Sequence, residues 1–196
     1  MQVRHAEYHR QTRETDIRLS INLDASGDSQ VKTGIGFFDH MLDQVARHGL
    51  FDLSVDAMGD LHIDDHHLVE DTGIALGKVF SEAVGDKRGI RRYGWAVVPL
   101  DEALVLVSLD LSGRGGYFGE LGDMDERVGQ FSTSLVSEFY RAFAVSAGVT
   151  LHVRTLCGQN THHVIEASFK AFARALREAV TMDERVVGVP STKGVL

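Results

Sequence analysis

The sequence predicts an α+β protein that arose by internal duplication, with each half forming a two-layer unit of sheet and helices. Two observations predict this class. The stretch at residues 64–71, which contains His-His-x-x-Glu, recurs 96 residues later at residues 160–166. Strand-like alternation and helical periodicity also follow one another in the same order on both sides of the chain's midpoint. We therefore expect a single domain, residues 1–196, of two repeats at about 1–90 and 91–196.

The strongest part of the repeat predicts one helix in each half, at residues 66–84 and 162–180. Apolar residues recur there at helical spacing, and Lys78 and Arg174 match on the side expected to face solvent. Seven of the nineteen aligned positions are identical. These are His66/His162, His67/His163, Glu70/Glu166, Ala75/Ala171, Glu82/Glu178, Ala83/Ala179 and Val84/Val180.

The remaining elements follow in order. Apolar and polar residues alternate at 17–23 and again at 105–111, which predicts a half-buried strand in each half. The other expected elements are a short strand near Val31, helices at 37–48 and 135–146 ended by Gly49 and near Gly148, and strands at 51–55 and 149–153. Each half thus reads strand, strand, helix, strand, helix, with room for one more short strand before the last helix. The seam falls around residues 85–94.

The repeated His-His-x-x-Glu predicts metal ligands. On a helix His66 and Glu70 share one face, while the adjacent His67 points away from His66. Each helix can therefore provide ligands to two ions more easily than to one. The two copies supply four imidazoles and two carboxylates. Such a set suits Mn, Fe, Co, Ni or Zn. The spacing excludes the His-Glu-x-x-His signature of metalloproteases, which needs histidines four residues apart.

Composition narrows the class of protein. The net charge of −8 and the pI near 5.6 argue against nucleic acid or an anionic membrane as partner. The single cysteine, Cys157, excludes internal disulfides, and the polar start at residues 1–5 does not resemble a signal peptide. We expect a soluble cytoplasmic protein with one core.

Three further places are candidates for chemistry, each with a plain structural alternative. His40 begins a helix and precedes the metal helix of its half, although a lone histidine there is more often structural. The basic run at 87–92 and the glycine-flanked Arg114 suit an anion, or are simply solvated. The tail at 190–194 offers hydroxyls, N–H groups and one cation to a phosphate, or is a frayed end.

Residues 34–44, 64–71, 158–166 and 191–194 together resemble imidazoleglycerol-phosphate dehydratase of histidine biosynthesis, and the likeness runs from about Glu7 to Leu196. The resemblance implies a duplicated fold like that of ribosomal protein S5 domain 2. It also implies a hollow homo-oligomer of twenty-four subunits, with two Mn²⁺ per active site at subunit contacts. The implied reaction removes water from imidazole glycerol phosphate to give imidazole acetol phosphate.

The resemblance also implies roles for individual residues. The implied metal ligands are His40, His66, His67, Glu70, His162, His163 and Glu166. The implied substrate-binding residues are Glu14, Arg92, Arg114, Ser191, Thr192 and Lys193. Glu14, Glu70 and Glu166 are the candidates for moving protons, and the sequence leaves open which carboxylate is the general base.

The implied reaction gives a physical reason to expect two metals. The proton to be lost lies on a carbon with no neighbouring carbonyl, so acid–base help of about 10²–10⁴-fold is too small. In the implied reaction, metals on both imidazole nitrogens would favour the imidazolate, whose electrons would expel the neighbouring hydroxyl to give a diazafulvene-like intermediate. That intermediate would acidify the next C–H. The metals act as Lewis acids and as a template.

Two residues depart from the family pattern. Gln159 stands where a lysine is common, and Glu138 stands where a histidine ligand is expected. At the offset of 98 that superposes the first helices of the two halves, Glu138 falls opposite His40, so we expect Glu138 to be a ligand. Two other functions stay open at this stage, a dinuclear metallohydrolase acting on a small phosphoester and a metal-assembled shell without activity.

Overall fold

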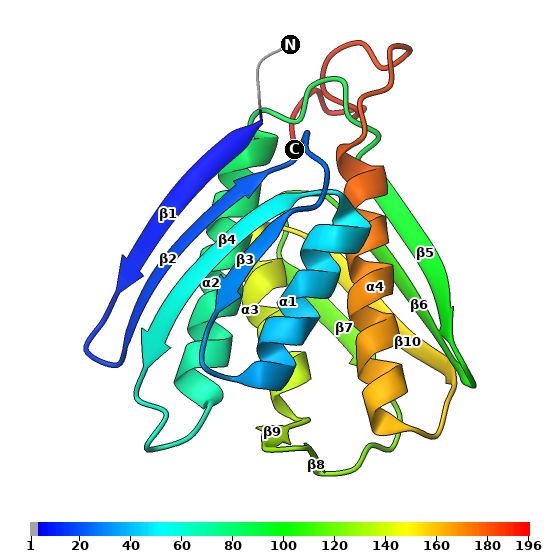
Figure 1. Cartoon of the computed structure of the whole chain (residues 1–196). Helices are drawn as coiled ribbons and strands as arrows, with labels where there is room; N and C mark the ends of the chain where they lie inside the picture. The colour runs from blue at the N-terminus through cyan, green and yellow to red at the C-terminus, as the bar shows by residue number, and fades with distance from the viewer. Residues whose placement is uncertain (1–3) are drawn as a thin grey trace.

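Two four-stranded sheets enclose a layer of four helices (Figure 1) in the computed structural model, which describes residues 4–196. The start of the expected polar segment, residues 1–3, lies outside the described part. The first half contains β1 (His5–Gln11), β2 (Thr15–Asn22), β3 (Ser29–Lys32), α1 (Gly36–Gly49), β4 (Asp52–Gly59) and α2 (His66–Val84). Within residues 4–196, no helix is both long enough and apolar enough to cross a membrane.

The second half repeats this order. It contains β5 (Tyr93–Leu100), β6 (Ala103–Asp110), β7 (Gly116–Glu120), α3 (Leu135–Ala147), β10 (Thr150–Cys157) and α4 (Thr161–Val180). A small hairpin of β8 (Arg127–Val128) and β9 (Phe131–Ser132) precedes α3. The sheet orders β1-β2-β4-β3 and β5-β6-β10-β7 correspond strand for strand. The predicted duplicated α+β class is therefore confirmed, as are both predicted histidine-bearing helices.

The expected number of strands was one too small in each half, because β1 and β5 were not predicted. Strand β1 lies at a sheet edge, and its outward residues are polar, so the strand lacks a clear apolar alternation. Strand β5 has the reverse pattern, with small Gly94 and Ala96 facing the helices and large Trp95 facing out. The alternation of apolar and polar residues is weaker in an edge strand, because another strand pairs with only one of its two edges.

Helix α1 ends differently from the prediction. Gly49 is still helical, and the left-handed cap is Leu50 with φ of 54°. Glycine is required at position 49 for space, since an added Cβ would approach the Phe51 ring to 2.5 Å. Its counterpart Gly148 does take the left-handed conformation, with φ of 66°, as expected of a glycine at a helix end.

The two halves meet mainly where α2 packs on α3. Gly73 and Gly77, one turn apart on α2, lie against the backbone of α3. An added Cβ would stand 2.8 Å from the Phe139 carbonyl oxygen at Gly73 and 2.7 Å from the Phe143 carbonyl oxygen at Gly77. The phenylalanine rings on α3 fill the surrounding core. The glycines thus permit a backbone approach that any other residue would prevent.

This contact gives a stability prediction with a definite sign. Helix propensity alone would make Gly77→Ala more stable by about 1 kcal/mol. The collision with α3 should outweigh this gain and destabilise the fold by about 1–3 kcal/mol, measured by urea unfolding. The control is Gly36→Ala, because a Cβ at Gly36 meets nothing within 4 Å. A Gly77→Ala protein as stable as Gly36→Ala would contradict the close packing.

Candidate functional site

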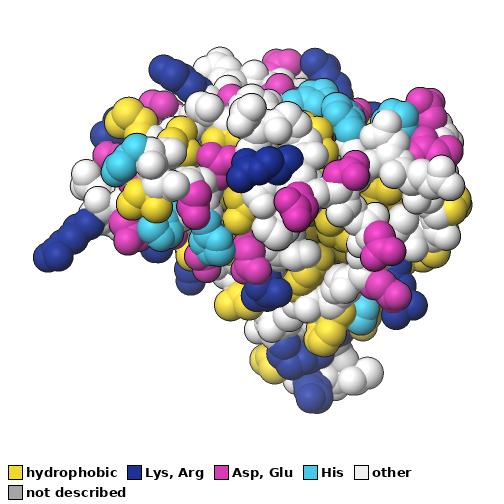
Figure 2. All heavy atoms as spheres, turned by 90° about the horizontal axis from the view of Figure 1, so that it is seen from below, with side chains coloured by type: hydrophobic (Ala, Val, Ile, Leu, Met, Phe, Trp, Pro, Cys, Tyr) yellow, Lys and Arg dark blue, Asp and Glu magenta, His cyan; other side chains and the backbone are white. Residues whose placement is uncertain are grey.

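All four helices begin at the same end of the molecule, the lower end in Figure 1. The two histidine pairs sit in the first turns of α2 and α4. Asp64 accepts the backbone N–H of His66 at 2.8 Å, and Asn160, its counterpart in the repeat, accepts that of His162 at 3.0 Å. These side chains satisfy otherwise unpaired N–H groups and fix where each pair begins. Figure 2, which looks onto this end, shows histidines in separate places.

The geometry of the two pairs is nearly the same. The rings of His66 and His67 are 6.3 Å apart at 83°, and those of His162 and His163 are 6.1 Å apart at 83°. The first histidine of each pair faces the glutamate four residues on, with Nε2 to Oε2 distances of 3.5 Å in α2 and 3.0 Å in α4. The predicted divergence of adjacent histidines is therefore confirmed.

The first set of candidate ligands joins α1 and α4. His40 on α1 and His162 on α4 both approach Glu166, with Nε2 to Oε2 distances of 3.3 and 3.0 Å. One ligand atom from each residue lies within 4.8 Å of the others, and within residues 4–196 these three form the only such group of histidine, cysteine and acidic side chains. Two imidazole nitrogens and a carboxylate oxygen fit a borderline divalent ion such as Mn²⁺ or Zn²⁺.

Glu166 is ionised despite its partial burial. Burial alone would raise its pKa, but the hydrogen bonds from Lys170, His162 and His40 outweigh that effect and hold the pKa at about 2. The Lys170 ammonium lies 2.7 Å from Oε1, and both side chains are mostly buried, at 17% and 13% exposed. Lys170 thus keeps one carboxylate oxygen fixed while the other faces the two histidines.

The second set of candidate ligands lies on α2 and the elements beside it. His66 faces Glu70, and the Nδ1 of His67 lies 3.1 Å from Asp60 and 3.9 Å from Glu14. Glu14 comes from the hairpin between β1 and β2 and is 55% exposed. The hydrogen bond to Asp60 raises the pKa of His67 above its usual value. The structure thus brings Glu14 to the histidines of α2, in a group distinct from that of His40.

Glu138 lies in the first turn of α3, as expected from its alignment with His40, but its carboxylate is occupied. Arg141, one turn along the helix, donates to Oε2 at 2.5 Å. The pKa of Arg141 is raised chiefly by this hydrogen bond, and Glu70 of α2 also contributes. Arg141 therefore lies in the field of both carboxylates. His152 on the neighbouring strand β10 stacks on Phe118 of β7.

The residues expected to bind the phosphate lie at the opposite end of the molecule from the histidine pairs. Arg92 precedes β5 and packs beside the last turn of α4, where its N–H donates to the Ala179 carbonyl. Helix α4 has 20 residues and so separates His162 from this end by about 30 Å. Within one chain the structure does not bring the phosphate candidates and the candidate ligands together.

The phosphate candidates themselves differ in availability. The Arg92 guanidinium is engaged by Asp110 at 2.7 Å and by the Pro190 carbonyl at 2.8 Å, which draws the tail to it. Arg114 is exposed. The tail is a turn in which the N–H of Lys193 donates to the Ser191 hydroxyl, with Thr192 and the Lys193 side chain exposed. Arg92 is thus better placed to orient the tail than to bind an anion, because its guanidinium N–H groups already donate to Asp110 and Pro190.

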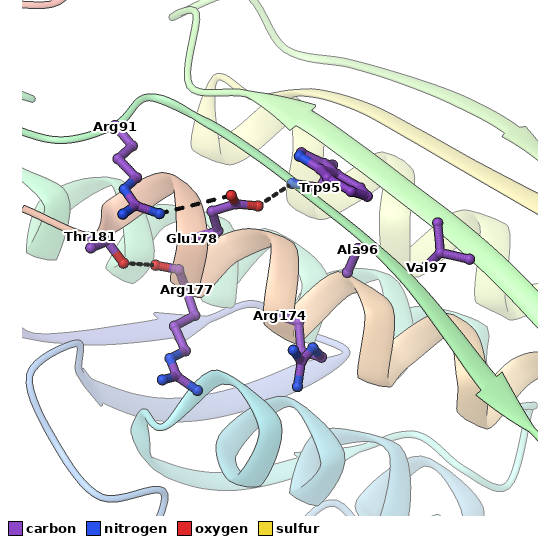
Figure 3. A pocket seen from close by; sticks show the side chains of 8 residues that line it. All are labelled: Arg91, Trp95, Ala96, Val97, Arg174, Arg177, Glu178 and Thr181. Atoms are coloured by element: carbon purple, nitrogen blue, oxygen red, sulfur yellow. Dashed lines mark hydrogen bonds and ion pairs between the residues drawn. The ribbon is translucent and has the colours of Figure 1, made fainter.

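The other basic residues of the run at 87–92 do not point to a common place either. Arg91 lies in a cavity of about 570 Å³ between β5 and α4, and it faces Glu178 (Figure 3). Arg174 and Arg177 extend from α4, and Trp95 of β5 is also among the residues that line the cavity (Figure 3). None of the candidate metal ligands lines this cavity. The run at 87–92 therefore does not form one anion site.

Comparison with known proteins decides the family. A family model described as imidazoleglycerol-phosphate dehydratase matches residues 33–176. The chain is 58% identical over 193 residues to the imidazoleglycerol-phosphate dehydratase of Desulforamulus reducens, covering 98% of each. The chain belongs to the imidazoleglycerol-phosphate dehydratase family. It is therefore an enzyme, a hydro-lyase of histidine biosynthesis, and the metallohydrolase and inert-shell alternatives lose their basis.

Other relatives in the imidazoleglycerol-phosphate dehydratase family agree. The protein of Acetivibrio thermocellus is 59% identical over 190 residues, with 97% of each chain covered. The crystal structure of the Staphylococcus aureus enzyme matches with a TM-score of 0.83 at 40% identity, over 91% of this chain and 99% of that one. The structure from Pyrococcus furiosus gives 0.83 at 38%, over 96% and 100%. The resemblance seen in the sequence is confirmed.

Sequence reasoning missed three residues of the candidate site. Lys170 binds Glu166, Asp60 binds His67, and Glu102 binds the Nδ1 of His163 at 2.8 Å. One signal was available for Glu102, which follows Glu14 by 88 residues, the same offset that relates the strands at 17–23 and 105–111. Nothing in the sequence pattern distinguishes Asp60 from a loop aspartate.

The partly buried pair of Lys170 and Glu166 gives a pH prediction. A carboxylate with a depressed pKa stabilises the fold above its unfolded pKa, near 4.5, and this contribution is lost as the pH falls toward about 2. Lys170→Met should raise the pKa of Glu166, seen by carboxyl ¹³C NMR. It should cost about 1–3 kcal/mol of unfolding free energy near neutral pH, with the difference shrinking toward pH 2.

The control for this experiment is Arg174→Met, one turn further along α4. In the described part of the chain, Arg174 pairs with no carboxylate. This variant should leave the Glu166 pKa where it is. An unchanged pKa in Lys170→Met would mean that the imidazoles alone hold Glu166 ionised.

Proposed function

We propose that the chain dehydrates imidazole glycerol phosphate to imidazole acetol phosphate, with two Mn²⁺ per active site, in sites shared between subunits of a homo-oligomer. The observation that carries the metal part is the convergence of His40, His162 and Glu166. These residues come from two helices and are up to 126 positions apart, yet their ligand atoms lie within 4.8 Å. A structural role alone does not require two half-exposed imidazoles to share one carboxylate.

The donor set fits the proposed ions. Four imidazoles and two glutamates from the repeated motif form a mixed nitrogen and oxygen set, and His40 extends it. When bound, the ions supply Lewis acidity toward the imidazole and the leaving hydroxyl and hold the substrate in place. We assign His40, His162 and Glu166 to one ion's environment, and His66 with Glu70 to the corresponding position on α2. His67 and His163 point away from these and serve the other ions.

The chain's own groups supply the proton transfers in this proposal. Glu14 is the best candidate for the group that removes or returns a proton, because it is 55% exposed and, in the described residues, its one ion-pair partner is His67, 3.9 Å away. Glu166 is held ionised by Lys170 and is better suited to ligation than to proton transfer. Glu70 faces His66 at 3.5 Å, is 45% exposed, and remains a candidate for both roles.

A complete site needs more than one subunit in this proposal. The substrate is a small phosphate ester, whereas about 30 Å of helix separates the α4 histidines from Arg92 and the tail. The phosphate of a substrate at the histidines must therefore be met by Arg114, Ser191, Thr192 and Lys193 of another copy. Self-association is also supported by the outer face of the second sheet, where Trp95 and Phe118 are 63% and 56% exposed.

We carry over from the family resemblance an assembly of twenty-four subunits and a cytoplasmic location. Analytical ultracentrifugation tests the assembly directly, because each chain has a mass of 21.6 kDa. A particle of twenty-four chains is expected. A monomer that is fully active would remove the need for shared sites.

The first functional prediction concerns the metal. Removing divalent ions with a chelator should abolish dehydration of imidazole glycerol phosphate, because the reaction depends on Lewis acidity that no side chain supplies. Mn²⁺ should restore the activity, with two ions bound per subunit by elemental analysis. Full activity in thoroughly demetallated protein would end the metal-dependent mechanism.

The second concerns Glu138, which we propose as a ligand that exchanges Arg141 for the ion. Glu138→Ala should lose one ion per subunit and most activity. Glu138→His should keep both ions and shift preference toward Zn²⁺ or Ni²⁺, because imidazole is a softer donor than carboxylate. The matched control is Arg141→Gln, which removes the same ion pair but leaves the carboxylate. Wild-type metal affinity in Glu138→Ala would show that Glu138 is no ligand.

The third tests whether sites are shared. His162→Ala impairs the ligand set on α4, and Lys193→Ala impairs the phosphate set at the other end of the fold. Each variant alone should be nearly inactive. Oligomers refolded from a mixture of the two should regain part of the activity, since some sites then draw both intact sets from different copies. Mixed oligomers no more active than the two parents would indicate that each chain forms its own site.

A further inference from the structure

The second histidine of each pair is held by a carboxylate from outside its own helix. His163 contacts Glu102 through Nδ1 at 2.8 Å, and His67 contacts Asp60 through Nδ1 at 3.1 and 3.2 Å. An ionised carboxylate only accepts hydrogen bonds, so Nδ1 carries the proton in both histidines. In the neutral ring the lone pair is then on Nε2, the nitrogen that can bind a metal ion. The Asp101 carboxylate lies 3.9 Å from the Nε2 of His163, beyond hydrogen-bonding distance.

Glu102 is rigidly placed for this contact. It lies in the tight turn between β5 and β6, where Leu100 and Ala103 form the last pair. Its other oxygen, Oε1, accepts the backbone N–H groups of Asn160 at 2.8 Å and Gln159 at 3.2 Å. One carboxylate therefore joins the hairpin to the loop before α4 and to His163 on α4. Such a fixed geometry holds the ring in one orientation.

The equivalent residue in the first half is Glu14, but it does not take the same role. The offset of 88 that relates β2 to β6 places Glu14 opposite Glu102, at the tip of the β1–β2 hairpin. Its carboxylate lies 3.9 Å from the His67 Nδ1, beyond hydrogen-bonding distance. Asp60 occupies the acceptor position instead, and its backbone N–H donates to the Glu14 carbonyl at 3.1 Å.

The second half has no room for an equivalent of Asp60. At the offset of 98 that relates β4 to β10, Asp60 aligns with Gly158. Gly158 has φ of 148°, and a Cβ there would lie 2.7 Å from the Val164 side chain and 3.0 Å from the Ala103 side chain. Different residues therefore accept the histidine Nδ1–H in the two halves, Asp60 in the first and Glu102 in the second. The hairpin glutamate is left free of this hydrogen bond only in the first half, where it is Glu14.

We propose that Asp60 and Glu102 are positioning residues that fix the Nε2 of His67 and His163 for metal ligation, and that Asp60 thereby frees Glu14 to act on the substrate. This inference rests on the proposed metal-dependent function. Carboxylate partners of this kind set the tautomer and orientation of ligating histidines, and their loss typically lowers metal affinity by about 10–100-fold.

The first test uses the metal-free protein, so that it is independent of activity. Two-bond ¹H–¹⁵N spectra of ¹⁵N-histidine-labelled protein report which ring nitrogen carries the proton, with assignment by His67→Gln and His163→Gln. Both rings should show the Nδ1–H form at a pH where they are neutral. In Glu102→Ala the His163 signal should shift to a mixture of the two forms while His67 is unchanged. An Nε2–H form for either ring in the wild type would overturn the proposal.

The second test is a Mn²⁺ titration of the whole protein. Glu102→Ala should weaken one class of site by about 10–100-fold. Glu102→Gln should weaken the same class of site, because its amide oxygen still accepts the two backbone N–H groups while its NH2 group faces Nδ1 and favours the Nε2–H form. Because this variant keeps the backbone contacts, it guards against misfolding as the explanation. Asp60→Ala should be mild, since Glu14 is near enough to replace the lost acceptor. Asp60→Ala combined with Glu14→Ala should reach the full loss.

The control is Asp16→Ala. Asp16 accepts a hydrogen bond from His9 at 2.7 Å on β1 and β2, outside the candidate ligand sets, and its loss should not change Mn²⁺ affinity. If the wild type binds no Mn²⁺, the proposed function fails whatever the tautomers are. If the wild type binds two ions and Glu102→Ala binds them equally well, the positioning proposal fails and the proposed function stands.

Discussion

The close packing of α2 on α3 determines how the two halves are placed, and the arrangement of the site depends on it. Gly73 and Gly77 let α2 approach the backbone of α3 at Phe139 and Phe143. With the halves fixed in this way, α1 of the first half lies beside α4 of the second. His40 can then reach Glu166 although 126 residues separate them. A packing constraint in the core, rather than any local motif, therefore assembles the candidate ligands.

The two repeats have the same geometry at their histidine pairs but different residues around them. The two histidine pairs retain almost identical ring separations and angles. Around them the partners differ, since Lys170 secures Glu166 while the equivalent position on α2 is Ile74. On the neighbouring helices His40 corresponds to Glu138, which Arg141 occupies. The two halves thus present related but unequal sets of candidate ligands.

Much of the fold could be predicted from the sequence, because its periodic segments carry strong signals. The helices at 66–84 and 162–180 agree with α2 and α4 to within a residue. The strand β1 could not be predicted in this way, since its inward Arg10 is held by Asp71 of α2 at 2.8 Å, a partner 61 residues away. Gly49 was misread because its role is to leave space for Phe51, which only the tertiary structure reveals.

The site was predictable in its residue types and not in its grouping. The repeat identifies the histidines and glutamates, but the separation of Arg92 from them becomes visible only once α4 is seen to run the length of the molecule. The sequence also gave no reason to expect that Arg92 is held by Asp110 and the tail. Long-range contacts of this kind are invisible to local periodicity.

The proposed function places two Mn²⁺ in each active site, with the phosphate of the substrate bound by residues of another subunit. Anomalous diffraction at the manganese edge, from crystals of the Mn²⁺-loaded protein, locates the ions directly. We predict two ions per active site, one of them ligated by His40, His162 and Glu166, with Arg114 and Lys193 of another subunit facing the site. Ions found away from the histidines, or a site completed by the residues of one chain, would contradict the proposal.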